Sequence, residues 1–322
     1  MARKDLVDGS KAYKDRKFPE AERLFRSAAS RDPEGNTLEG RTAQLSLART
    51  LHSMYIGDRL HKELAQQALA EYKKSLPQSL KDLADTKAAY DKSPNSTSEQ
   101  ARYLGSLNAV DSSTSAIASL NENLEQPDAA KEWLTSVAGD AKYPETARAR
   151  SLSSLSGKLN TCANDITDTE QTKKTVKKDG KDTFQFVKPQ KPEDFTKLKE
   201  CVDQGVKLID QAAALEPDLV KNATKLDLKA ASDVQLALYS EILKSFESVR
   251  SYRASLLIQA MRAAEMDGKT ADADKLKTDS EAAKNAFKEL SDVVRKIQTE
   301  IDDRTAAKAE AEKGAAANAN KK

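Results

Sequence analysis

The sequence predicts an all-α protein built from antiparallel helix pairs. Charged residues make up 32% of the 322 residues and aromatic residues only 5%, a composition that favours helices over strands. Apolar residues also recur at helical spacing along most of the chain. A chain of this length exceeds one small core, so we expect two domains or one elongated array.

The segment 6–33 predicts the basic helix–turn–helix unit. Two apolar-periodic stretches meet there at a short turn around Lys17. Small residues allow the two backbones to approach and aromatic rings fill the gaps beside them. The second helix ends at Asp32-Pro33, because proline cannot continue a helix. The residues expected to interlock are Gly9, Tyr13, Phe18, Ala21, Phe25 and Ala28.

Two further pairs are predicted before residue 140. The second comprises 37–55 and 59–76, separated by Gly57-Asp58, and Pro77 is expected to kink or restart the helix. The third follows a linker at 92–99 and comprises 99–123 and 127–139. Its Trp133, the single tryptophan of the chain, is expected to pack between helices.

The pattern changes after a helix predicted from Pro144 to about residue 165. Residues 172–187 alternate around Asp179-Gly180, which predicts a β-hairpin with a type I′ turn. Its run of lysines is either a solvated face or a contact site for an acidic partner.

The C-terminal part returns to helices. We expect helices at about 193–213, 234–266 and 270–304, with a short one at 218–228. The last two would form a long helical hairpin, and the tail would be frayed or disordered. The predicted domain organisation is therefore N-terminal helical repeats at 1–168, a hairpin insertion at 169–192, C-terminal helices at 193–304 and a tail at 305–322.

Cys162 and Cys201 are the only cysteines. They could close a disulfide worth about 3–4 kcal/mol by chain entropy, or remain two buried thiols. Neither belongs to a Cys-x-x-Cys pair, which argues against a zinc or redox motif.

The spacings resemble those of the tetratricopeptide repeat family, and the order of features is similar to exported, sometimes lipid-anchored, bacterial members. The segments that carry the resemblance are GSKAYKDRKFPEAERLFRSAASRDP, MYIGDRLHKELAQQALAEYKKSL, DAAKEWLTSVAGDAKYPETARARSLSSL and GVKLIDQAAALEPD. The resemblance implies a right-handed α-solenoid whose concave groove binds a peptide or another protein. It also implies the bacterial periplasm, cell envelope or exterior if a leader has been removed, and otherwise the cytoplasm.

We therefore expect a non-enzymatic scaffold for protein–protein interaction, without cofactor or metal. Its candidate partner-binding residues are polar positions on the first helices of the pairs: Lys11, Lys14, Arg41, Gln44 and Arg49. The alternative is a structural protein that assembles with itself into oligomers or filaments through its end faces.

Other function classes find little support. The net charge is +2, which argues against nucleic acid as a partner, and no apolar run is long enough to span a membrane. His52 and His61 are the only histidines, and no catalytic motif is present.

Overall fold

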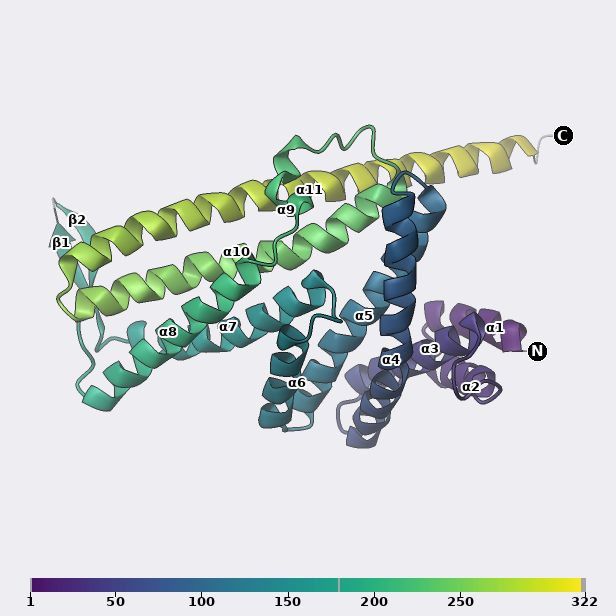
Figure 1. Ribbon diagram of the computed structural model, residues 1–322, viewed down its shortest axis with the longest axis horizontal. Coiled ribbons are helices and arrows are strands. Elements are labelled where there is room, and N and C mark those ends of the chain that lie inside the picture. Colours follow the sequence, from purple (N-terminus) through teal and green to yellow (C-terminus); the bar gives the residue numbers. More distant parts are fainter. Residues whose placement is uncertain (1, 179, 320–322) are drawn as a thin grey trace. The chain divides into compact units, whose positions relative to one another are not determined.

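The computed structural model describes residues 2–178 and 180–319, and it confirms the all-α class (Figure 1). The described residues form eleven α-helices and one two-stranded antiparallel hairpin. The chain divides into two compact units, residues 1–147 (unit 1) and 148–322 (unit 2). This division falls within the helix Glu145–Thr167 (α7), and the predicted boundary after residue 168 lies just beyond the end of that helix.

Unit 1 consists of six helices, each of which packs on the next along the chain. They are α1 (Ala2–Lys14), α2 (Phe18–Ala29), α3 (Leu38–Gly57), α4 (Lys62–Lys92), α5 (Thr97–Asn123) and α6 (Pro127–Gly139). The third helix is capped by the side chain of Thr37, which accepts the backbone N–H of Gly40, and the fifth by Ser96. The helices predicted in this unit therefore occur, and their boundaries shift by a few residues except in α4, which continues to Lys92 instead of ending at residue 76.

The first two helices approach closely at Gly9. A Cβ placed on Gly9 would lie 2.9 Å from the Phe25 ring, so only glycine fits without a shift of that ring. Tyr13 and Phe18 meet edge to face across the turn, with ring centroids 5.4 Å apart. Small residues and aromatic rings thus alternate in this contact, as the sequence predicts.

Of the two expected outcomes at Pro77, a kink or a restart of the helix, the restart does not occur. The fourth helix runs through the proline as one helix of 31 residues. Tyr72 and Leu76 before the proline, and Leu83 after it, are all buried. Their packing holds both halves of α4 in place, and this outweighs the one backbone hydrogen bond that proline cannot donate.

Trp133 packs between helices, as predicted. Its Nε1–H donates to the backbone carbonyl of Thr114 on α5 at 2.9 Å, and its ring meets Tyr143 edge to face. The tryptophan is half-buried and fixes α6 on α5.

Unit 2 contains the hairpin and a long antiparallel helix pair, α10 and α11, which lie side by side (Figure 1). Its elements are α7 (Glu145–Thr167), β1 (Lys173–Lys178), β2 (Lys181–Phe186), α8 (Pro192–Ala213), α9 (Asp218–Lys221), α10 (Asp233–Met266) and α11 (Thr270–Ala319). The short helix expected after residue 218 is therefore only four residues long, followed by a 3₁₀ turn at Ala223–Lys225.

The last helix is longer than predicted. Its helical hydrogen bonding continues to Ala319, although a disordered tail was expected from residue 305. The residues after 304 are rich in alanine, which has the highest helix propensity, so the helix continues without an apolar stripe. Residues 320–322 of that expected tail lie outside the described residues.

The predicted hairpin occurs in the expected place. Its strands pair from Lys173 with Phe186 to Lys178 with Lys181, and Gly180 has φ +76°. The predicted type I′ turn also requires Asp179, which lies outside the described residues. Phe186 enters an apolar cluster with residues of α7, α8 and α10, so the hairpin is anchored to the helices.

Candidate binding grooves

A groove opens in unit 1 between α3, α4 and α5, with a volume of about 650 Å³; we name it groove 1. Its walls carry small, polar and charged side chains rather than a continuous apolar surface. The lining residues are Leu38, Arg41, Thr42, Leu45, Ser46, Arg49, Ser79, Asp82, Asp85, Thr86, Ala101, Arg102, Gly105, Ser106 and Ala109.

One wall of groove 1 is fixed by Arg41. Its Nε lies 2.7 Å from Oδ2 of Asp82, which joins α3 to α4. Its Nη1 donates to the backbone carbonyls of Gly35 and Asn36 at 3.1 and 3.2 Å. The guanidinium is therefore used for holding the loop before α3, and only part of it faces the groove.

The opposite helix is joined to α3 by Arg49, whose Nη2 donates to Ser112 Oγ on α5 at 2.9 Å. Arg102 on α5 is exposed and pairs with Glu99 one turn earlier. Asp85 on α4 is exposed as well. The groove thus offers both signs of charge and several hydroxyl groups, together with the exposed apolar side chain of Leu38.

Gly105 keeps the wall of groove 1 open. It lies inside α5, and no atom is found within 4 Å of the position that its Cβ would take. Glycine inside a helix costs about 1 kcal/mol relative to alanine. A side chain at Gly9 would collide with Phe25, but no such contact exists at Gly105. Close packing therefore does not explain the glycine at position 105.

The five sequence-predicted binding residues are not all brought together. Arg41 and Arg49 line groove 1. Gln44 is buried instead, and its Nε2 donates to the carbonyls of Asp32 and Pro33, which closes the end of the preceding turn. Lys11 and Lys14 are exposed on α1 and are not among the groove's lining residues.

Sequence reasoning missed the contribution of α4 and α5 to groove 1. Asp82 and Thr86 lie in a segment whose periodicity is weak, and the side chains of α5 are mostly small. The single usable signal was Gly105, because an isolated glycine within a helical pattern suggests a packing or functional reason.

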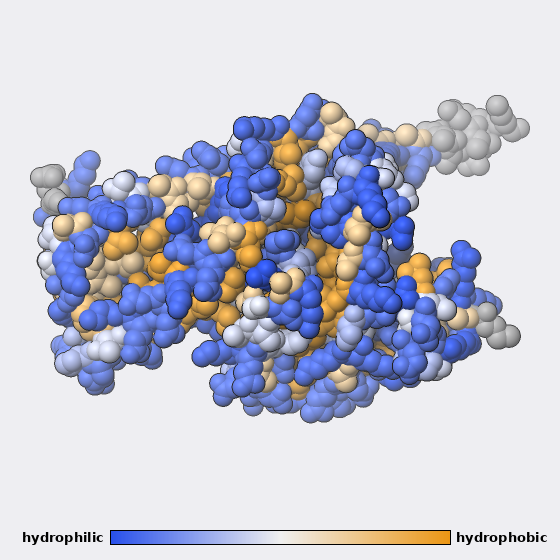
Figure 2. Space-filling model, in the orientation of Figure 1, coloured by the Kyte–Doolittle hydropathy of each residue, from blue (hydrophilic) through white to orange (hydrophobic). Residues whose placement is uncertain are grey.

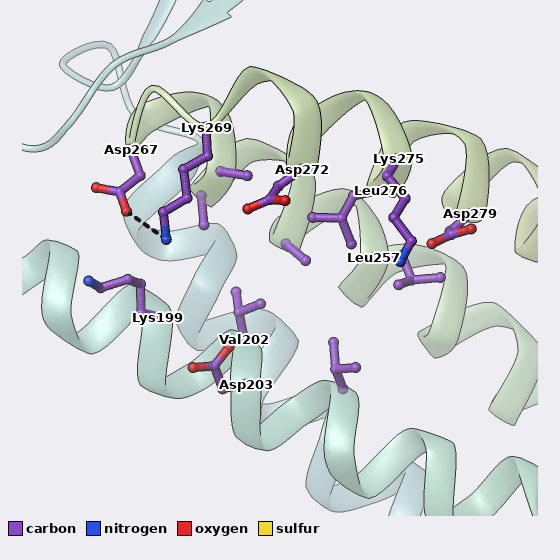
Figure 3. Close-up of a pocket in the computed structure, with 14 residues that line it drawn as sticks. Lys199, Val202, Asp203, Leu257, Asp267, Lys269, Asp272, Lys275, Leu276 and Asp279 are labelled. Carbon is purple, nitrogen blue, oxygen red and sulfur yellow. Dashed lines mark ion pairs between the residues drawn. The ribbon is translucent and has the colours of Figure 1, made fainter.

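A second groove, groove 2, opens in unit 2 between α8, α10 and α11, with a volume of about 490 Å³ (Figure 3). Val202 from α8, Leu257 from α10 and Leu276 from α11 point into it. Figure 2 shows hydrophobic surface where these helices meet. The remaining floor residues are Val206, Ala260, Ala263 and Ala264.

The rim of groove 2 carries both signs of charge. At one end Asp267 pairs with Lys188 at 2.8 Å. It also pairs with Lys269 at 3.3 Å, as Figure 3 shows. Hydrogen bonds from these two lysines, Lys188 first, lower the pKa of the Asp267 carboxyl. Along the two flanking helices the rim continues with Lys199, Asp203, Asp272, Lys275 and Asp279.

A disulfide lies next to the floor of groove 2. Cys162 on α7 and Cys201 on α8 are bonded, with Cα atoms 6.2 Å apart and 39 positions between them in the sequence. The sequence left open whether the two cysteines form a disulfide or remain buried thiols, and the structure has the disulfide. It closes the loop that contains the hairpin, and Cys201 adjoins the groove residue Val202.

The two histidines have separate local partners. His52 is half-buried edge-on to the Tyr72 ring, and this burial lowers the pKa of its imidazole. His61 is exposed, with Nδ1 2.7 Å from Glu63 Oε1. Within residues 2–178 and 180–319, no three His, Cys, Asp or Glu side chains gather as a metal site would require.

No protein-family model matches the chain, and no curated protein matches it at a significant level. Among the helices of the described part, none is both long enough and apolar enough to cross a membrane.

Proposed function

We propose that the protein is a non-enzymatic scaffold of the tetratricopeptide repeat type, in which unit 1 forms a right-handed solenoid. Groove 1 would be its concave surface and would hold an extended segment of a protein partner. The consecutive packing of α1 to α6 supports this proposal, because stacked helix pairs create a continuous groove. The supply of only two histidines, both engaged by neighbours in unit 1, supports a role without catalysis.

The observation that carries the proposal is the open position at Gly105. A binding wall needs free space beside it, and the chain maintains that space at a cost in helix stability. Next to it, Asp85, Arg102 and Ser106 supply the charges and hydroxyl that would hold a polar peptide.

The test is a substitution that fills the space beside Gly105 and leaves the packed side of α5 unchanged. Gly105→Trp would occupy groove 1, so capture of partners from cells of the source organism should be lost. Gly105→Ala adds only a methyl group, so it should weaken capture far less than Gly105→Trp does. Gly139→Trp is the matched control, since Gly139 also has no atom within 4 Å of its Cβ position but is not part of the groove.

A direct measurement identifies what touches the groove. A photo-crosslinking side chain at position 105 should join covalently to one protein species, and the same side chain at 139 should not. Equal capture by the Gly105→Trp and Gly139→Trp variants would show that the partner does not occupy groove 1.

Groove 2 favours a second candidate within the same scaffold role, the docking of an amphipathic helix. Ala260 and Ala264 on α10 are half-buried, Ala263 beside them is buried, and α8 and α11 flank these small side chains. Such a floor permits a further helix to approach closely, with its polar face toward the charged rim. Ala260→Trp should then abolish capture of that partner, whereas Ala271→Trp on exposed α11 surface should not.

A further inference from the structure

The β-hairpin of unit 2 is held firmly at its base. Val187 N–H donates to the carbonyl of Thr172 at 2.9 Å, and Thr172 Oγ1 donates to the carbonyl of Ile166 on α7 at 2.8 Å. Phe186 is buried, with the guanidinium of Arg262 4.5 Å from its ring centroid. The rest of both strands is largely exposed. The strands are therefore presented to solvent from a fixed support.

The outer edge of β1 carries backbone groups that do not face β2. Hydrogen-bonded and non-hydrogen-bonded pairs alternate along an antiparallel ladder. The bond between Val187 and Thr172 sets this alternation, so Lys173, Thr175 and Lys177 direct their backbone groups to the outer edge. The N–H of Lys173 already donates to the carbonyl of Thr169 at 2.9 Å, so Thr175 and Lys177 are the residues whose N–H and C=O can pair with an added strand. An extended chain can add there as a third strand.

The charge of β1 determines which kind of chain can add to it as a third strand. The sequence of β1 is KKTVKK, and both Lys174 and Lys177 are exposed. The ammonium of Lys173 pairs with Asp168 and that of Lys174 donates to the Glu170 carbonyl, so Lys177 is the lysine on which the charge argument rests. Lysines on an edge strand repel a second copy of the same strand, but they attract an acidic one.

If the lysines of β1 only kept the hairpin soluble, no exposed aromatic ring would be needed beside them. Phe184 on β2 is 55% exposed, although it lies next to charged residues. Its ring is covered on one side by the Lys173 ammonium, which lies 4.4 Å from the ring centroid. The strand pair thus presents both apolar and cationic surface.

The position of Phe184 argues for a peptide rather than a lipid surface. It pairs with Thr175 in the middle of the strands, and Asp182 follows on the same face toward the turn. A side chain that enters a membrane interface would be expected at the tip, without a carboxylate between it and the turn.

We propose that the outer edge of β1 binds an acidic, extended segment of a partner protein by strand addition. Backbone hydrogen bonds would form with Thr175 and Lys177, and a carboxylate of the partner would pair with the exposed side chain of Lys177. This surface belongs to unit 2 and does not depend on groove 1.

The first experiment uses short capped peptides and the full-length protein, with binding followed by fluorescence anisotropy. A peptide with the central sequence EETVEE should bind, and one with KKTVKK should not. A third peptide, EEPVEE, keeps every carboxylate but lacks one backbone N–H, so it should bind about tenfold more weakly. Equal binding of EETVEE and EEPVEE would show simple charge attraction and would overturn strand addition.

The second experiment locates the edge with two matched charge reversals. Lys177→Glu on β1 should weaken EETVEE binding about tenfold, because an attractive cross-strand pair becomes repulsive. Lys181→Glu makes the same charge change on β2 and should have a much smaller effect. Equal weakening by both, or binding to phosphatidylserine vesicles without binding to EETVEE, would overturn the proposal.

Discussion

Arg250 and Glu216 form a two-pronged ion pair in unit 2. Nε and Nη2 of the arginine lie 2.9 Å from the two carboxylate oxygens, and the side chains are only 18% and 12% exposed. The third nitrogen, Nη1, donates to the carbonyl of Ala286 at 3.2 Å. One guanidinium therefore joins the segment after α8, the middle of α10 and the middle of α11.

Replacing Arg250 by methionine should destabilise unit 2 by about 2–3 kcal/mol. The substitution keeps the apolar stem but leaves the carboxylate of Glu216 without its partner in a place with little water. Differential scanning calorimetry of the full chain measures this loss. Adding Glu216→Met should restore part of the stability, since the orphaned charge is then removed. A double variant that is less stable than the single one would contradict this account.

Reduction of the disulfide should destabilise unit 2 and leave unit 1 unchanged. The bond between Cys162 and Cys201 spans 39 positions, for which chain entropy gives about 4 kcal/mol. Calorimetry with and without reductant should show the unit 2 transition fall by about 10 °C. The double variant Cys162→Ser, Cys201→Ser should melt at the lower temperature and ignore the reductant. Identical melting of the original chain under both conditions would exclude a stabilising bond.

Arg304 fixes α11 against the loop that precedes α10. It donates to the carbonyls of Leu228, Lys229 and Ala231, and it pairs with Asp233 and Glu300. The pKa of Asp233 is lowered by hydrogen bonds from Lys308 and Arg304, and the pKa of Glu300 by hydrogen bonds from Lys229 and Arg304.

The contribution of these two carboxylates should therefore depend on pH. Because both pKa values are lowered by folding, their stabilisation is complete above the unfolded values of about 4 and is lost as the pH falls through the folded ones. The stability difference between the original chain and Arg304→Met should be largest at pH 7 and smaller below pH 4. The bonds to backbone carbonyls persist in acid, so the difference should not vanish. A difference that is constant from pH 7 to pH 3 would show that the ion pairs contribute nothing.

Helix boundaries could be predicted from the sequence where local features of one segment determine where its helix begins and ends. The sequence places a helix at 234–266, and α10 begins at Asp233 because Ser232 and Gln235 form a capping box there. Gly268, with φ +74°, then allows the turn into α11. Local periodicity, a cap and a glycine were enough for these boundaries.

Contacts between distant segments could not be predicted in the same way. Gln44 and Arg41 are equally polar in the sequence, yet the first is buried against the carbonyls of a turn and the second lies at a groove. The pairing of Asp82 with Arg41 brings together residues of two helices, and no local pattern encodes it. Groove 1 depends on three helices at once, so the sequence alone could name only part of its lining.

Gly9 and Gly105 have opposite surroundings, so the same substitution at both positions tests how unit 1 is packed. Gly9→Ala should destabilise unit 1 by about 1 kcal/mol, because the new methyl group would lie 2.9 Å from the Phe25 ring. Gly105→Ala should stabilise it by up to about 1 kcal/mol, because alanine is the better helix former and the space beside Gly105 is open.

The stability of both variants can be measured by tryptophan fluorescence during unfolding in urea. Trp133 is the single tryptophan and lies in unit 1, so its fluorescence follows the unfolding of that unit. The two substitutions are chemically identical and both lie inside helices, so helix propensity alone would stabilise both variants. Opposite signs are expected only if α1 approaches Phe25 closely while the wall of groove 1 is free. Equal stabilisation would mean that α1 packs loosely, and equal destabilisation would mean that the space at Gly105 is filled by the chain itself.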